Sequence, residues 1–194
     1  MYEFLQGKLV EKNPAYAVID CSGVGYYVNI SLNTFSKIGK EEQVKLFVHF
    51  IVREDAMQLY GFVDVHERET FRKLISVSGV GASTARMILS SMNPDEVYQS
   101  INSGNVAALK AVKGIGAKSA QRIIVDLKDK LDELPVDGEN LPMQHNTLKD
   151  EALSALIALG FSKPMAQKGL TKVFKTNPEV DKVEDLIKET LKVL

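Results

Sequence analysis

The chain has 194 residues, a net charge of -1 at pH 7 and a hydrophobic content of 45%, which allows one domain or two to three small ones with packed cores. The near-neutral charge excludes a uniformly basic nucleic-acid binder, so charge has to be counted by segment. The single cysteine excludes a disulfide within the chain, and no stretch approaches the ~20 apolar residues that a membrane span needs, so we expect a cytoplasmic protein without membrane contact.

Residues 1–63 have the pattern of an all-β segment. Short runs of β-branched and aromatic residues alternate with turn signals such as Asn13–Pro14. Five such runs in one short segment indicate a small closed barrel of the OB-fold type. Residues 32–39 are expected to form a short helical or irregular connection. The predicted strands are Glu3–Lys12, Tyr16–Cys21, Tyr26–Ser31, Val44–Arg53 and Met57–Val63.

Two adjacent carboxylates, Glu54 and Asp55, lie between the last two predicted strands. At a hairpin tip such a pair is most often a solubility feature. On a protein that binds nucleic acid it would also repel phosphate, and could keep strands apart or reject the wrong DNA shape. We therefore treat the pair as a candidate site whose meaning depends on the rest of the chain.

Residues 64–134 change to helical periodicity, and we expect five helices there. A stretch of sixteen residues occurs twice in this segment, as 74–89 and 109–124, and the copies agree at seven positions. Each copy is predicted to form a helix, a tight Gly-hydrophobic-Gly turn and a second helix. The last of the five helices is expected to run from Ala117 to Leu134.

Each Gly-hydrophobic-Gly turn leads into the start of a helix. Glycine allows positive φ and close approach of the backbone to a ligand, and the N–H groups of a helix N-terminus favour an anion. The central apolar residue is expected to anchor the turn in the core. We predict two binding sites for DNA backbone phosphate, with sequence-independent, salt-sensitive binding. The candidate residues are Gly79, Val80, Gly81 and Ser83 in the first copy and Gly114, Ile115, Gly116, Lys118 and Arg122 in the second.

The two copies differ in charge. Residues 106–131 carry six basic and two acidic side chains, and Lys113, Lys118 and Arg122 surround the second turn. The first copy has serines in place of both lysines and one basic residue, Arg86. We expect the first copy to rely more on its backbone N–H and hydroxyl groups.

The C-terminal third divides into a linker and a helical bundle. Residues 135–147 are polar, contain Gly138 and Pro142 and show no period, as is typical of a flexible linker. Residues 148–194 are predicted to form three short helices, with a turn at Gly160–Phe161 like the Gly-aromatic loop of ubiquitin-associated domains, which mostly bind proteins. The candidate partner-binding residues are Leu156, Leu159, Gly160 and Phe161.

Signals for catalysis and cofactors are missing from the sequence. It contains no Gly-x-x-x-x-Gly-Lys-Ser/Thr phosphate loop and no Gly-x-Ser-x-Gly motif, and its three histidines have no metal-ligand spacing. We expect no cofactor and no metal. Two alternatives stay open: a helix-hairpin-helix glycosylase or nuclease, and an OB-fold that stacks single-stranded bases. The aromatic residues for stacking would be Tyr26, Tyr27, Phe47 and Phe50, although alternation places many of them in the core.

Over essentially its whole length the chain resembles the RuvA family, the Holliday-junction-binding subunits of the bacterial branch migration complex. The resemblance rests on the order of barrel, twin glycine hairpins, linker and helical tail, and on specific runs. These runs are Gly23-Val24-Gly25-Tyr26, Val52-Arg53-Glu54-Asp55-Ala56 followed by Leu59-Tyr60-Gly61-Phe62, and Ala158-Leu159-Gly160-Phe161. One departure is Ser83, where the family often has lysine.

The resemblance implies a non-catalytic subunit that binds four-way junction DNA in recombination and repair. It implies a homotetramer that holds the junction open, a second tetramer that can complete an octamer, and hairpins that grip the backbone of each arm. Glu54 and Asp55 would be the acidic pin at the junction centre. The C-terminal bundle would bind the RuvB motor, which hydrolyses ATP, and the RuvC resolvase would be a further partner.

The resemblance also divides the chain into domains. It implies an OB-fold barrel over residues 1–63, a tandem helix-hairpin-helix domain over 64–134, a linker over 135–147 and a motor-binding domain over 148–194.

Overall fold

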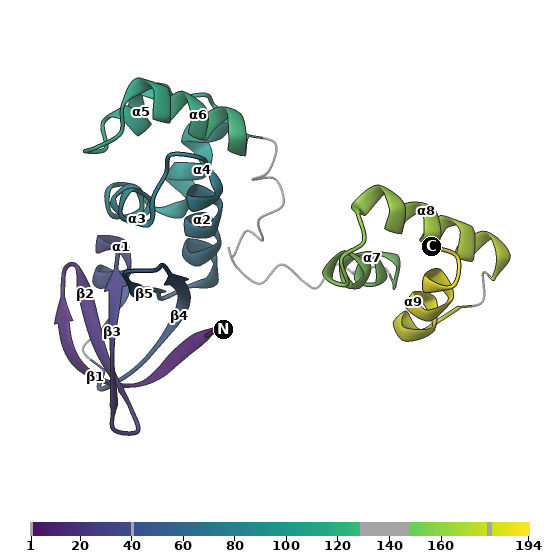
Figure 1. Ribbon diagram of the computed structural model, residues 1–194, viewed down its shortest axis with the longest axis horizontal. Helices are drawn as coiled ribbons and strands as arrows, with labels where there is room; N and C mark the ends of the chain where they lie inside the picture. Colours follow the sequence, from purple (N-terminus) through teal and green to yellow (C-terminus); the bar gives the residue numbers. More distant parts are fainter. Residues whose placement is uncertain (1, 40, 129–147, 178–179) are drawn as a thin grey trace. The chain divides into compact units, whose positions relative to one another are not determined.

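The computed structural model describes residues 2–39, 41–128, 148–177 and 180–194. The chain separates into two compact units, Met1–Asp137 and Gly138–Leu194, and each is described by itself. Figure 1 shows a barrel with helices in the first unit and a helical bundle in the second. The predicted linker, 135–147, lies outside the described residues.

The barrel consists of five strands that close on themselves in the order β1-β2-β3-β5-β4, with β4 pairing back to β1. Neighbouring strands are antiparallel except β3 and β5, which are parallel. Inward-facing residues alternate along the strands, so that Ile19, Val28 and Leu46 are fully buried. The predicted closed barrel is confirmed. Its elements are β1 (Phe4–Asn13), β2 (Tyr16–Cys21), β3 (Val24–Ile30), α1 (Leu32–Lys37), β4 (Gln43–Val52) and β5 (Met57–Phe62).

The turn between β2 and β3 is tighter than the sequence suggested. Ser22 and Gly23 have φ angles of 55° and 91°, and Cys21 pairs directly with Val24. Two consecutive residues with positive φ form the type I′ turn, whose twist matches that of the two strands. β3 therefore begins at Val24, two residues before its predicted start at Tyr26.

Five helices follow the barrel within residues 64–128 of the first unit, in agreement with the predicted number. Their apolar faces share one core that includes Phe71, Leu74, Ile88 and Ile123. At the start of α4, Asn93 accepts a hydrogen bond from the backbone of the third helical residue, which closes a capping box. The helices are α2 (Val65–Ser76), α3 (Ala82–Ser91), α4 (Pro94–Asn102), α5 (Val106–Lys110) and α6 (Ala117–Leu127). The predicted extension of α6 beyond residue 128 lies outside the described residues.

Buried polar contacts join α2 to the barrel. The Glu67 carboxylate is fully buried and accepts hydrogen bonds from the hydroxyls of Ser31 and Thr34, at the start of α1. The buried guanidinium of Arg68 donates to the carboxylate and the carbonyl of Glu3. α2 also packs on β4 and β5. The helix that leads into the first glycine turn is thus built onto the strands that carry Glu54 and Asp55.

The described residues of the second unit form a bundle of three helices with its own core. Leu156, Leu170, Val173 and Leu186 are buried at its centre. The predicted start of the second helix near Pro164 is confirmed, since this helix begins at Lys163. Proline is tolerated there because the N–H groups of the first turn have no helical partner. The helices are α7 (Leu148–Ala158), α8 (Lys163–Thr176) and α9 (Val183–Leu191).

Candidate nucleic-acid interface

The two glycine turns have the same backbone conformation. Gly79 and Gly114 have φ angles of 88° and 91°, in the left-handed region that side chains disfavour. Val80 N–H donates to the Val77 carbonyl at 3.0 Å, and Ile115 N–H donates to the corresponding carbonyl at 3.1 Å. The repeat in the sequence is therefore a repeat of structure.

The central apolar residues anchor the turns, as predicted. The side chains of Val80 and Ile115 are each only 6% exposed and belong to the core of the helical region. A buried side chain cannot reach a ligand, and the N–H groups of both residues already donate within the turns, so Val80 and Ile115 hold the turns in place without contacting a ligand.

Both turns end at helix N-termini that no side chain caps. Gly81 and Gly116 are the N-caps of α3 and α6, and neither helix has a side-chain hydrogen bond at its cap. The carbonyls of these glycines accept the first helical bonds, from the N–H groups of Ala85 and Ala120. The N–H groups before those residues point out of the helix end, where the helix dipole favours an anion. This is the arrangement that holds a phosphate.

The space around the turns is open. A Cβ built on Gly79, Gly81, Gly114 or Gly116 meets no atom within 4 Å. These glycines are therefore not required by packing within the chain. Their lack of side chains leaves the backbone accessible to a ligand that approaches closely.

Side chains distinguish the second turn from the first. Lys118 and Arg122 follow the second turn four residues apart, so they share one face of α6, and both are exposed. Arg122 forms a loose, exposed ion pair with Asp126 at 3.7 Å, which leaves its charge available. The equivalent residues in α3 are Ser83 and Met87, both exposed and uncharged. The second turn therefore has more positive charge at its surface than the first, as predicted.

Arg86, the one basic residue of the first copy, does not lie on that face. It stands one residue before the position equivalent to Arg122, and its guanidinium donates hydrogen bonds to Ala15 and Asn29 of the barrel. Sequence reasoning missed this role. The repeat contains a signal for it, because Arg86 is offset by one residue from the position equivalent to Arg122. One residue turns a helical side chain by about 100°, so the two side chains lie on different faces of their helices.

The acidic pair is placed at the tip of the β4–β5 hairpin, as predicted. A hydrogen bond from Arg53 N–H to the Ala56 carbonyl, at 2.8 Å, closes the turn around Glu54 and Asp55. Both carboxylates are exposed. Two negative charges project from the unit that also carries both glycine turns.

The aromatic residues considered for base stacking do not form one platform. Tyr27 is 55% exposed, but its ring stacks on Tyr16 at a centroid distance of 4.6 Å. Phe50 packs against Tyr2, and Phe47 lies beneath the Lys45 ammonium. The expectation that many of them belong to the core is confirmed for Tyr26 and Phe50, which are half-buried and pack against the barrel core. Tyr27 is exposed, and Phe47 is half-buried outside that core.

The candidate partner-binding residues of the second unit divide between core and surface. Leu156 is fully buried in the bundle, so it supports the surface from beneath. Gly160 turns the chain with a φ of 98°, and Leu159 beside it is 61% exposed. Phe161 is half-buried against the core. Two further apolar residues of this unit, Ile157 and Met165, are exposed as well.

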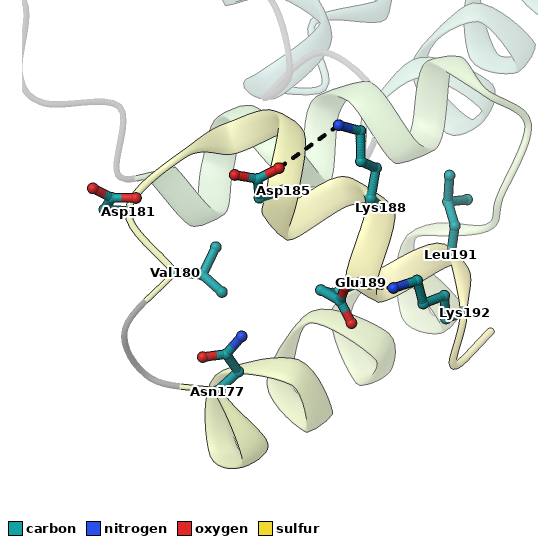
Figure 2. A pocket seen from close by; sticks show the side chains of 8 residues that line it. All are labelled: Asn177, Val180, Asp181, Asp185, Lys188, Glu189, Leu191 and Lys192. Carbon is teal, nitrogen blue, oxygen red and sulfur yellow. Dashed lines mark hydrogen bonds and ion pairs between the residues drawn. The ribbon is translucent and has the colours of Figure 1, made fainter.

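A hollow beside α9 is lined mainly by charged side chains (Figure 2). Lys188 pairs with Asp185 at 3.7 Å, and Lys192 pairs with Glu189 at 2.6 Å. These exposed pairs neutralise one another and leave no convergent set of free polar groups, so the hollow does not resemble a small-molecule site.

Metal and membrane features are absent from the described residues. These residues contain no group of three or more His, Cys, Asp or Glu side chains that could hold a metal ion. None of the helices in the described ranges combines the length and the apolar character that crossing a membrane requires.

Comparison with known proteins accounts for nearly the whole chain. Family models match in succession: a RuvA N-terminal domain over residues 1–61, a SAM-like helix-hairpin-helix tandem over 71–129 and a RuvA C-terminal domain over 147–194. The chain is 54% identical to the Holliday junction branch migration complex subunit RuvA of Christiangramia forsetii and 50% identical to that of Flavobacterium psychrophilum, each over 194 residues. The RuvA subunit of Cytophaga hutchinsonii is 43% identical over 198 residues. In all three comparisons 100% of both chains is covered.

Proposed function

The chain belongs to the RuvA family of Holliday junction branch migration complex subunits, and from this premise we propose that it is a non-catalytic subunit that holds a four-way DNA junction open and recruits a motor. The observation that carries the proposal is the presence, in one compact unit, of two equivalent glycine turns that lead into uncapped helix N-termini and of an exposed acidic tip.

The glycine turns are proposed to supply affinity. Backbone N–H groups at the starts of α3 and α6 would each bind a backbone phosphate, and the turns would follow one arm of the junction. Lys118 and Arg122 would add charge-assisted contacts at the second turn, while Ser83 would add a hydroxyl at the first. Contacts of this kind read no sequence, so the binding suits a junction that moves along DNA.

The acidic tip is proposed to supply selectivity. Continuous duplex would bring phosphates towards Glu54 and Asp55, and like charges at short range repel. At the centre of an open junction the strands separate, so that the tip finds room between them. Four copies arranged around the junction would place four such tips at its centre.

The second unit is proposed to bind the motor. Leu159 and Phe161 lie at its Gly160 turn, and Leu159 with the neighbouring Ile157 offers exposed apolar surface. Exposed apolar residues next to a loop suit a protein partner. In this proposal the RuvB motor hydrolyses ATP, the RuvC resolvase joins the complex at a later step, and the chain itself carries out no chemistry.

Gel-shift titration on a four-way junction, a duplex and a single strand of matched sequence tests the proposal. We expect a strong preference for the junction, with affinity falling linearly on a log–log plot against salt. Equal affinity for all three DNAs would refute the proposal. Incubation of a labelled junction with Mg²⁺ distinguishes the enzyme alternative, since strand cleavage by the pure protein would favour a helix-hairpin-helix nuclease.

A further inference from the structure

Arg86 joins α3 to the barrel. One terminal nitrogen of its guanidinium donates to the Ala15 carbonyl at 3.0 Å and to Asn29 Oδ1 at 3.1 Å. Asn29 is in β3, and Ala15 lies in the turn between β1 and β2. The charged side chain therefore bridges two segments of the barrel that lie 71 and 57 residues away in the sequence.

The contact continues to the strand that carries the acidic tip. The Asn29 side-chain amide donates to the Leu59 carbonyl at 3.1 Å, and Leu59 is in β5. β5 is one arm of the hairpin whose tip holds Glu54 and Asp55. A continuous path of hydrogen bonds thus runs from α3 through Asn29 to this hairpin.

A second contact fixes α3 one turn further along. The Ser90 hydroxyl accepts a hydrogen bond from Leu32 N–H at 3.1 Å and donates to the Arg86 carbonyl at 2.8 Å. Residues 86 and 90 face the same side of the helix. Two attachment points on one helix restrain its rotation as well as its distance from the barrel.

The second copy has no counterpart of this anchor. The residue equivalent to Arg86 is Gln121, which is exposed on α6. Figure 1 shows α5 and α6 at the end of the unit that is farther from the barrel, with α3 beside α1. This position of the repeat faces the barrel in α3, where it is Arg86. In α6 the same position faces solvent, and the residue there is the neutral Gln121.

We propose that Arg86 is a specificity-determining positioning residue, which fixes the first glycine turn relative to the Glu54–Asp55 tip. The inference rests on the proposed function. The start of α3 would bind a phosphate on a junction arm, and the tip would stand at the junction centre, so their separation sets which DNA shape fits both. Arg86 would act through the backbone of α3 and through Asn29, without touching DNA.

Salt dependence separates this role from a direct contact with DNA. A residue that neutralises a phosphate changes the slope of log affinity against log salt by ~0.9, and weakens binding to all DNA shapes alike. A positioning residue leaves that slope unchanged, because no counterion is released at it. Its loss frees α3 to shift on the barrel, so that duplex can occupy the turns without meeting the acidic tip.

The test compares Arg86→Gln with Arg122→Gln in the full chain, by salt-titrated binding to junction and to duplex. Arg86→Gln introduces the side chain that the second copy has at the equivalent position, Gln121. We expect it to lower the junction-to-duplex affinity ratio about three- to tenfold with an unchanged salt slope, a change comparable to the net contribution of one ordinary hydrogen bond. Arg122→Gln should reduce the slope by ~0.9 and leave the ratio unchanged. A reduced slope for Arg86→Gln, or an unchanged ratio, overturns the proposal.

Asn29→Ala gives the second measurement. It keeps the Arg86 charge but removes the link to β5, so it should lower the ratio as Arg86→Gln does, and the double variant should be no worse than either single variant. If the Arg86→Gln protein does not fold, the affinity ratio of Asn29→Ala still tests the proposed positioning role. A wild-type chain without junction preference would defeat the proposed function itself, whereas wild-type preference retained in both variants defeats this inference alone.

Discussion

The two glycines of each turn have different roles at the scale of single residues. Gly114 needs its hydrogen, since a side chain at φ 91° is strained, whereas Gly116 has φ -83° and ψ 167°, which any residue adopts. Gly116→Ala should therefore leave the melting temperature unchanged and lower junction affinity about tenfold, because the new methyl group keeps the phosphate away from the backbone. Thermal unfolding and gel-shift titration measure the two effects.

Two variants control this prediction. Gly114→Ala should lower both stability and binding, with a strain of about 1–2 kcal/mol. Gly25→Ala, in β3, places its methyl in ordinary contact with Val18 at 3.7 Å and should change DNA binding little. Wild-type affinity in Gly116→Ala would mean that no ligand approaches this turn closely.

Glu67 is expected to make stability depend on pH. Burial raises the pKa of the Glu67 carboxyl above its ordinary value of 4.5, although the hydrogen bonds from Ser31 and Thr34 oppose the shift. The folded protein then holds this proton more tightly than the unfolded chain, so the contribution is present below pH 4.5 and is lost as pH rises through the folded pKa. The melting temperature of wild type relative to Glu67→Gln should fall as pH rises from 4.5 to neutral.

Thermal unfolding of both proteins across that pH range measures the difference. Thr34→Val removes one hydrogen bond that favours the carboxylate, so it should steepen the fall. Parallel curves for wild type and Glu67→Gln would show that the carboxyl titrates alike in the folded and unfolded chains.

Sequence reasoning at this scale succeeded where local rules decide. The glycine turns and their buried anchors, Val80 and Ile115, follow from a pattern confined to a few residues. The offset of Arg86 in the repeat indicates its face of α3, but its partners could not be predicted, because Ala15 and Asn29 are brought to α3 only when the helical region packs on the barrel. Composition marks a basic residue, but tertiary packing decides what it faces.

At the scale of elements, the β4–β5 hairpin offers a direct test of selectivity. The double change Glu54→Gln and Asp55→Asn keeps the shape of the tip and removes both charges. Repulsion of duplex phosphate then disappears, so duplex affinity should rise about tenfold at low salt and the preference for the junction should fall. Gel-shift titration of both DNAs measures the ratio. Glu41→Gln, at another exposed site of the barrel region, serves as the control, and an unchanged ratio in the double variant would remove the proposed role of the tip.

The order of elements was predictable because each has a clear period and clear punctuation. The barrel strands, the five helices and the final bundle appear where turn residues and helix caps indicate them. The early start of β3 was missed because a two-residue turn with Ser22 at positive φ has no strong sequence signal. The contact of α1 with α3 was equally hidden, since it joins segments that no local pattern relates.

For the whole molecule, the division into two units predicts that DNA binding and motor stimulation can be separated. The cores of the barrel and its helices lie within Met1–Asp137, and the core around Leu156 and Leu170 lies within Gly138–Leu194. A chain that ends at Asp137 should keep junction affinity within about twofold, because both glycine turns and the acidic tip lie within the first unit, which has its own cores. If the proposed motor contact lies in the second unit, this chain should no longer stimulate ATP hydrolysis by the RuvB motor.

The full-length variant Leu159→Asp provides the matched experiment for the second unit. Leu159 is 61% exposed, so a charge there should leave the bundle folded while it weakens an apolar contact with the motor. We therefore expect wild-type junction affinity, an unchanged circular dichroism spectrum and reduced ATPase stimulation. Full stimulation by the shortened chain would place the motor contact in the first unit. Full stimulation by Leu159→Asp, with none by the shortened chain, would move the contact to another face of the bundle.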